Sequence, residues 1–116
     1  MGQLTTHVLD PASDQPAGGM AWTLRRADES GTPLASGRTN SDGRNDGPVL
    51  EGTAFRAGTY ELVFFAGDYF RDSGTDLLEP AFLDQVVIRF GVADAASHYH
   101  VPLLISPYGY STYRGS

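Results

Sequence analysis

The sequence predicts an all-β fold, a Greek-key β-sandwich of about seven to eight short strands with one short helix. Two observations support this prediction. The 116-residue chain contains fourteen glycines and seven prolines, which interrupt it at short intervals. No stretch of about ten residues keeps the apolar period of a helix, whereas several short runs alternate apolar and polar side chains. We therefore expect residues 1–116 to form a single domain of strands and turns.

The first two strands are expected near the N-terminus. Residues 4–9 alternate so that His7 lies on the face opposite the apolar side chains, and Asp10-Pro11 ends the run. Residues 20–26 alternate in the same way. Alternation places Leu4, Thr6 and Val8 on one face of the first strand, and it places Met20, Trp22 and Leu24 on a buried face of the second.

The following segment is polar and rich in turns. Short strands are predicted at residues 34–39 and 49–55. Asp42-Gly43 lies between them and is a strong signal for a tight turn. We expect this turn to lie at the surface.

The clearest strand is predicted at residues 59–66, which are apolar enough on both faces to lie inside a sheet. Gly67 is expected to end this strand. Asp68 is then expected to cap a short helix through residues 69–71, the one helix predicted in the chain.

Three more strands are expected at residues 85–92, 98–105 and 109–116. Pro102 has no N–H to donate to a ladder, so it should mark an irregularity or a missing neighbour. In the strand that contains it, alternation turns Tyr99, Val101, Leu103 and Ile105 toward the core and His98, His100, Pro102 and Leu104 away from it.

Composition excludes several functions. The chain has no cysteine and no lysine, so thiol nucleophiles, disulfides and Schiff-base chemistry are impossible. A net charge of −6 disfavours binding to nucleic acid or to anionic membranes. Apolar runs are far shorter than the ~20 residues of a membrane span, and the N-terminus lacks the pattern of a signal peptide. We therefore expect a cytoplasmic protein with no nucleic-acid or membrane partner.

Three stretches carry the functional signal. They are Leu4-Thr5-Thr6-His7-Val8-Leu9-Asp10, Asp42-Gly43-Arg44, and the block from His98 to Ser116, which ends in Tyr113-Arg114-Gly115-Ser116. Together they resemble the 5-hydroxyisourate hydrolases, the transthyretin-like enzymes of the urate pathway, over nearly the whole chain. The two end blocks are specific because each runs seven residues or more, whereas Asp-Gly-Arg alone is a weak match.

The resemblance implies a fold, an assembly and a reaction. The fold is the transthyretin sandwich, two four-stranded sheets, and the assembly is a homotetramer with active sites at the interface between dimers. The reaction is hydrolysis of 5-hydroxyisourate to 2-oxo-4-hydroxy-4-carboxy-5-ureidoimidazoline in urate degradation. No metal or other cofactor is expected.

Two histidines and one arginine are the main catalytic candidates. Taken alone, a strand histidine is usually a half-exposed polar residue and a loop arginine a solvated charge. The resemblance instead makes His7 and His100 active-site residues and makes His7 and Arg44 substrate contacts. A neutral imidazole can deprotonate water near pH 7, and a guanidinium can stabilise the resulting oxyanion. The general base is His7 or His100, and the sequence does not choose between them.

The C-terminal motif adds further candidates. Tyr113 is implied as a substrate contact. Ser116 is predicted to be catalytic, because its hydroxyl or terminal carboxylate could orient His7, His100 or Arg44. Arg114 alternates to the other strand face, so its role in bracing an interface or contacting ligand stays open.

Two alternatives compete with metal-free hydrolysis. His98 and His100 would project from one strand face with side chains roughly 7 Å apart. With His7 they could form a three-histidine zinc site that activates water, although we favour His98 as a surface group. The second alternative is a small-molecule carrier, because transthyretin itself shares the fold and much of the block after Leu103. His7, Arg44, His100 and the Tyr-Arg-Gly-Ser ending favour the enzyme, because the carrier lacks them.

Overall fold

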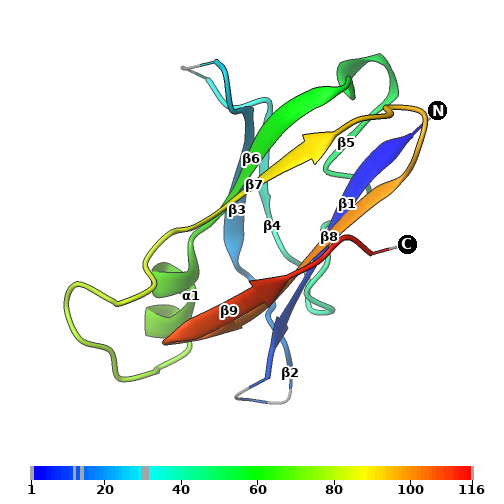
Figure 1. Cartoon of the computed structure of the whole chain (residues 1–116). Coiled ribbons are helices and arrows are strands. Elements are labelled where there is room, and N and C mark those ends of the chain that lie inside the picture. The colour runs from blue at the N-terminus through cyan, green and yellow to red at the C-terminus, as the bar shows by residue number, and fades with distance from the viewer. Residues whose placement is uncertain (1, 12, 14, 30–31, 116) are drawn as a thin grey trace.

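Two β-sheets face each other in the computed structural model, which describes residues 2–11, 13, 15–29 and 32–115 (Figure 1). Nine strands are found in this part of the chain, and two of them are only two residues long. In chain order they are β1 (Gln3–Asp10), β2 (Gln15–Pro16), β3 (Ala21–Arg26), β4 (Ala35–Arg38), β5 (Leu50–Glu51), β6 (Gly58–Phe64), β7 (Val86–Val92), β8 (Tyr99–Ser106) and β9 (Gly109–Thr112). Helix α1 spans Ala66–Asp72, and a 3₁₀ turn, η1, spans Gly52–Ala54.

The strand order confirms the predicted sandwich. One sheet has the order β2-β1-β8-β9, with β5 added beside β1, and the other has the order β4-β3-β6-β7. β1 and β8 run parallel, and the remaining ladders are antiparallel. The chain therefore crosses between the two layers several times, and β1 is joined to a strand from the far end of the sequence.

Side-chain alternation fixes which face of each strand is buried, as predicted. Along β1 every second residue is buried, so Thr5 and His7 lie on the outer face of the sheet. β8 alternates in the same way at its start, which places His100 on the same outer face. The inward side chains of β1, β3 and β8 form much of the core, namely Leu4, Val8, Trp22, Leu24, Tyr99, Val101, Leu103 and Ile105.

The strand predicted at residues 49–55 is much shorter than expected. Only Leu50 and Glu51 pair with β1. Gly52 then adopts a φ of 67°, a left-handed conformation that turns the chain out of the sheet and into η1. The sequence pattern was wrong here because a single glycine conformation ended the strand.

Helix α1 begins earlier than predicted. Phe65 occupies the N-cap position, and Asp68 lies inside the first turn, so the prediction that Asp68 caps the helix is wrong. Gly67, which was expected to end the preceding strand, lies within the helix. Its N–H donates to the Asp84 carbonyl, and a Cβ at this position would collide with Asp84 Oδ1. Glycine at this position admits the returning loop. Among the described residues, no helix is long and apolar enough to cross a membrane.

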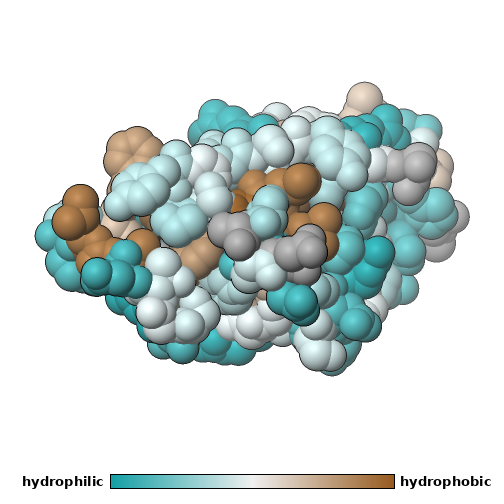
Figure 2. Space-filling model, turned by 90° about the horizontal axis from the view of Figure 1, so that it is seen from below, coloured by the Kyte–Doolittle hydropathy of each residue, from teal (hydrophilic) through white to brown (hydrophobic). Residues whose placement is uncertain are grey.

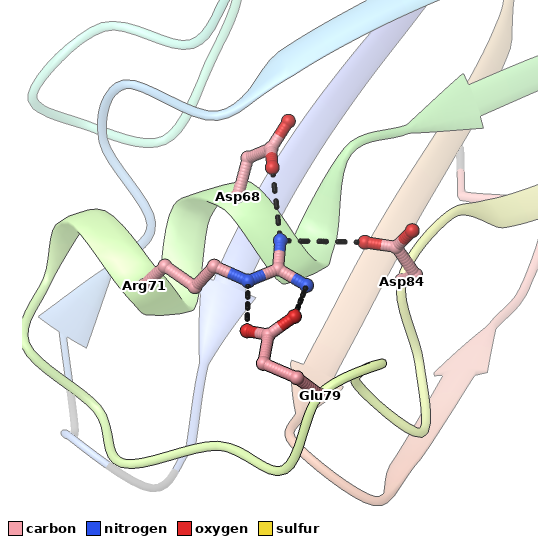
Figure 3. A network of polar contacts seen from close by, with 4 residues as sticks. All are labelled: Asp68, Arg71, Glu79 and Asp84. Atoms are coloured by element: carbon pink, nitrogen blue, oxygen red, sulfur yellow. Dashed lines mark hydrogen bonds and ion pairs between the residues drawn. The ribbon is translucent and has the colours of Figure 1, made fainter.

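Arg71 ties helix α1 to the loop that follows it (Figure 3). Its guanidinium contacts Glu79 through two nitrogens, at 2.8 and 3.4 Å, and donates to Asp68 at 2.9 Å and to Asp84 at 3.5 Å. A two-pronged contact of this kind holds geometry better than a single ion pair. The network anchors the loop between α1 and β7 at one end of the sandwich.

The last strand is also shorter than the predicted range of 109–116. β9 ends at Thr112, and only an isolated pair, His100 with Gly115, continues the same register. Pro102 faces Tyr113 at the next hydrogen-bonding position and has no N–H to donate. Thr112 Oγ1 donates to the Pro102 carbonyl at 2.7 Å instead. The irregularity expected at Pro102 is therefore confirmed, and it ends the strand.

Candidate active site

The candidate catalytic residues meet on the outer face of the β1–β8 pair. The parallel register places Thr5 opposite His100 and His7 opposite Pro102. Strand spacing and rise then put the Cα atoms of His7 and His100 about 8 Å apart on one face. Residues that are far apart in sequence thus form one surface.

A tight turn positions Arg44. The Gly43 N–H donates to the Asn40 carbonyl at 2.9 Å, which closes a turn at the predicted Asp42-Gly43 position. The Asn40 side-chain oxygen accepts hydrogen bonds from the backbone N–H groups of Asp42, at 2.9 Å, and Arg44, at 3.2 Å. Such a side-chain bridge rigidifies the turn, so the backbone of Arg44 has a defined direction.

The same turn docks against β1. The Val8 N–H donates to the Gly43 carbonyl at 2.7 Å, and Arg44 pairs with His7 in an isolated bridge. Gly43 has a φ of 77°, and a Cβ at this position would lie 2.3 Å from the Val8 carbonyl oxygen. Glycine is therefore required for the approach that brings Arg44 beside His7. The Arg44 side chain is exposed and forms no ion pair with any residue that the structure describes.

His7 is half-buried, and its ring is held by the same turn. Nε2 lies 3.0 Å from the Asp42 carbonyl oxygen. A carbonyl only accepts hydrogen bonds, so Nε2 carries the proton in this contact. Among the described residues, no partner contacts Nδ1 of His7.

His100 is held by a hydroxyl and by the sheet. Its Nδ1 lies 2.8 Å from Thr5 Oγ1, across the β1–β8 ladder. Burial lowers the pKa of His100 below its ordinary value, and the positive charges of Arg44 and His7 lower that pKa further. His100 is therefore neutral near pH 7 and sits in the field of the other two candidates.

Gly115 packs directly on His100. Its N–H donates to the His100 carbonyl at 2.7 Å. A Cβ on Gly115 would lie 2.7 Å from Cδ2 of the imidazole ring, closer than real carbon contacts. The glycine of the Tyr-Arg-Gly-Ser motif thus has a steric explanation, which the sequence alone did not provide.

The other residues of that motif have different positions. Tyr113 lies just beyond the end of β9, and its side chain is 62% exposed. The guanidinium carbon of Arg114 lies 4.0 Å from the centre of the Tyr99 ring, and its Nη2 donates to the His98 carbonyl at 3.1 Å. Arg114 therefore fastens the end of the chain to the start of β8. Ser116 lies outside the described residues.

The three-histidine alternative does not form within this chain. His98 precedes β8 and is exposed, and its carbonyl is engaged by Arg114. Within the described ranges there is no group of three or more His, Cys, Asp or Glu side chains that could hold a metal ion. His7 and His100 thus stand together with Arg44 rather than with a third ligand.

A cleft of about 240 Å³ lies between β7 and β8, lined by Ile88, Phe90, Tyr99, Val101, Tyr113 and Arg114 among others. It contains neither His7, His100 nor Arg44. This cleft is therefore separate from the two histidines and the arginine of the candidate site.

Sequence reasoning missed three contributors to the site. Thr5 lies two residues before His7 on the same strand face, and the Asp42 carbonyl and the Asn40 side chain act through the turn. The segment Asn40-Ser41-Asp42-Gly43 has the composition of a side-chain-stabilised turn, so the role of Asn40 was detectable. Thr5 was detectable only once β1 was known to pair with β8.

A transthyretin-like β-sandwich with an outward-facing pair of histidines beside an arginine defines the class of this protein. The model of the HIUase/transthyretin family matches residues 4–115. The chain is 62% identical to 5-hydroxyisourate hydrolase 2 of Rhizobium meliloti, covering 99% of this chain and 97% of the relative. It is 65% identical to the 5-hydroxyisourate hydrolase of Mesorhizobium japonicum, and the match covers 99% of this chain and 93% of the relative. The chain belongs to the HIUase/transthyretin family, which confirms the resemblance seen in its motifs.

Solved structures agree with this assignment. The 5-hydroxyisourate hydrolase of Klebsiella pneumoniae superposes with a TM-score of 0.83 at 34% identity, covering 100% of both chains. An (S)-allantoin synthase superposes with a TM-score of 0.92 at 45% identity, and the match covers 99% of this chain and 44% of that longer chain. Transthyretin of Sparus aurata has the same fold, with a TM-score of 0.83 at 26% identity, and the match covers 97% of this chain and 96% of that chain. The two hydrolases of Rhizobium meliloti and Mesorhizobium japonicum share more sequence with this chain, 62% and 65%, than the transthyretin of Sparus aurata does, 26%.

Proposed function

We propose that this protein hydrolyses 5-hydroxyisourate at the surface formed by His7, Arg44 and His100. The observation that carries the proposal is the convergence of the family's three motif blocks, from β1, the 40–44 turn and β8, on one face of one sheet. The names of its relatives supply the substrate. The residues supply chemistry that suits it.

The reaction adds water across an amide-like bond of a six-membered ring. A neutral imidazole removes a proton from water as its oxygen attacks the ring carbonyl, a step that contributes typically 10²–10⁴-fold. Arg44 stabilises the oxyanion that forms, because its guanidinium has no competing ion pair among the described residues. The ring C–N bond then breaks to give 2-oxo-4-hydroxy-4-carboxy-5-ureidoimidazoline. This route uses no cofactor.

We further propose that a second copy of the chain closes the site, within a homotetramer that has its sites between dimers. Small-molecule sites bury most of their ligand, whereas Arg44 and Tyr113 are exposed in a single chain. Figure 2 shows hydrophobic surface near the middle of one face and at the end of the molecule where the loop after α1 lies. Leu78, Phe82 and Tyr108 are large apolar or aromatic side chains that are more than half exposed. Surfaces of this kind favour association.

The experiment that tests the function follows the loss of freshly generated 5-hydroxyisourate with and without purified protein. Acceleration over the spontaneous background is expected, and it should depend on Arg44. No acceleration would favour a carrier of small molecules instead. The cytoplasmic location stays a prediction.

The assembly is tested separately by light scattering with size-exclusion chromatography. A mass close to four chains of 12.5 kDa is expected. Activity should fall on dilution at the concentration where the mass falls. A monomer with full specific activity would contradict the proposal that a second copy completes the site.

A further inference from the structure

The two histidines of the site have ring contacts of different kinds. Nε2 of His7 lies 3.0 Å from the Asp42 carbonyl oxygen, which can only accept a hydrogen bond. Neutral His7 therefore carries its proton on Nε2. Its remaining lone pair is on Nδ1, which has no partner among the described residues.

His100 has a hydroxyl as its ring partner. Thr5 Oγ1 lies 2.8 Å from His100 Nδ1, and in the described part of the chain its proton has no other acceptor. The neighbouring Thr6 behaves differently, because its hydroxyl faces inward and donates to the Val101 carbonyl at 2.7 Å. With the Thr5 hydroxyl as donor, Nδ1 of His100 accepts, and the proton of neutral His100 lies on Nε2.

We propose that Thr5 is a positioning residue that holds His100 with its proton on Nε2, so that His7 is the general base and neutral His100 donates a hydrogen bond from Nε2 to the oxyanion. The inference rests on the hydrolysis proposed above. It assigns distinct roles to two residues of the same type from the partners of their ring nitrogens.

The assignment gives a balanced reaction. Nδ1 of His7 takes a proton from water while the water oxygen bonds to the ring carbonyl carbon, and Arg44 stabilises the oxyanion. The C–N bond then breaks, and the leaving nitrogen takes the proton that Nδ1 of His7 has gained, while His100 donates a hydrogen bond from Nε2 to the oxyanion and keeps its proton. His7 is thereby returned to its neutral starting state.

The surroundings of His100 agree with a neutral hydrogen-bond donor. Burial lowers its pKa, and among the described residues Arg44 and His7 are the charged or titratable groups that lower it further. Thr5 from β1 and Gly115 from the end of the chain contribute no charge. A donor that stays neutral retains only one ring proton, so the partner of Nδ1 decides where that proton lies.

The kinetic test compares two substitutions of Thr5. Thr5→Val keeps the shape and removes the hydroxyl, and Thr5→Ser restores the hydroxyl. We expect Thr5→Val to lower kcat by roughly 10–100-fold, because a misplaced catalytic group loses up to about two orders of magnitude. KM should change far less, and Thr5→Ser should recover most of kcat. Equal kcat in wild type and Thr5→Val would overturn the proposal.

Thr6→Val is the matched control. It removes a hydroxyl from the same strand that also bonds to β8, but on the inward face and without contact to His100. We expect a lower melting temperature and a kcat within roughly twofold of wild type, since the net effect of one hydrogen bond on stability is ~1 kcal/mol. A loss of kcat as large as that of Thr5→Val would mean that the Thr5 effect is merely structural, and would overturn the proposal.

A spectroscopic test does not depend on activity. The chain has three histidines, so ¹⁵N spectra of imidazole-labelled protein are simple, and the exposed His98 can be assigned with His98→Gln. We expect protonated Nε2 and unprotonated Nδ1 in both His7 and His100. In Thr5→Val the Nδ1 signal of His100 should move to the position of a nitrogen without a hydrogen bond, and Thr5→Ser should return it. Protonated Nδ1 in wild-type His100 would overturn the inference even if the protein proves to be a hydrolase.

Discussion

Replacing Gly115 with alanine should disable the site while leaving the fold intact. Gly115 is not among the glycines with positive φ, so an alanine there meets no backbone strain and acts only through its Cβ. That Cβ would lie 2.7 Å from Cδ2 of His100 and 3.2 Å from its Cβ and Cγ. Ordinary carbon contacts are about 3.5–4.0 Å, so the imidazole or the end of the chain must move by about 1 Å.

The size of the effect follows from this displacement. A misplacement of ~1 Å at a catalytic group lowers the rate by about 10²-fold, or ~2.7 kcal/mol of transition-state stabilisation. Stability should change much less, because the contact lies at the end of the chain and the segment can shift. A loss below ~1 kcal/mol corresponds to about 4 °C in the melting temperature of a domain of this size.

The assay compares kcat for 5-hydroxyisourate and the melting temperature in three proteins: wild type, Gly115→Ala and Gly109→Ala. Gly109 is the control because it lies in β9, and the nearest atom that its Cβ would meet is Ser106 Oγ at 3.8 Å, an ordinary contact. We expect Gly109→Ala to keep kcat within roughly twofold of wild type. A fully active Gly115→Ala protein, or equal losses in the two variants, would refute the steric argument.

The remaining predictions use the same two measurements. Alanine at His7, Arg44 or His100 should each lower kcat by about two orders of magnitude or more with little change in melting temperature, and the double His7, His100 variant should lose less than the product of the singles. Turnover should fall on acidification, because the base must be neutral to accept a proton, and dialysis against a strong chelator should leave kcat unchanged. The fold lowers the pKa of His100, so on acidification the unfolded chain protonates this imidazole before the folded chain does. The free energy of unfolding should therefore fall as pH drops below ~6.5. In thermal melts, His100→Asn should flatten this pH dependence. A C-terminal tag should impair kcat more than an N-terminal tag, because the chain leaves directly beside His100; equal effects would argue against that placement.

Much of the site was predictable because period-two alternation and motif blocks are local signals. The outward position of His7 follows from the alternation of β1, and that of His100 from the alternation of β8. What the sequence could not supply is the parallel register of these strands. Thr5 and His100 are 95 residues apart, and no local pattern says that they face each other. The role of Thr5 therefore emerges only from the tertiary structure.

The predicted start of the helix was wrong because a tertiary contact overrode a local preference. Asp68 is a favourable helix cap, yet the helix begins three residues earlier than predicted, and Asp68 pairs with Arg71 instead. The close approach of Asp84 to Gly67 explains this start, because it supplies a backbone acceptor and excludes a side chain. Such a contact comes from a loop seventeen residues away, which helix propensity does not register.

Another error concerns the last strand, which was predicted to span residues 109–116 and ends at Thr112. Pro102 was expected to interrupt its ladder, and yet the strand opposite it was predicted to run to the end of the chain; these two expectations conflict. Pro102 decides the outcome, because Tyr113 finds no N–H opposite it and leaves the ladder. The register nevertheless persists to the His100–Gly115 pair.

This interruption affects how residues 113–115 contact β8. A regular strand would hold residues 113 and 114 flat against the sheet. Released at Pro102, the segment lets Arg114 pack on the Tyr99 ring, and Tyr113 stays 62% exposed. Gly115 then returns to the His100 backbone at the one place where a Cβ would strike the imidazole. Gly115 and Pro102, which lies two residues after His100, therefore act together to hold the end of the chain against His100, the proposed hydrogen-bond donor.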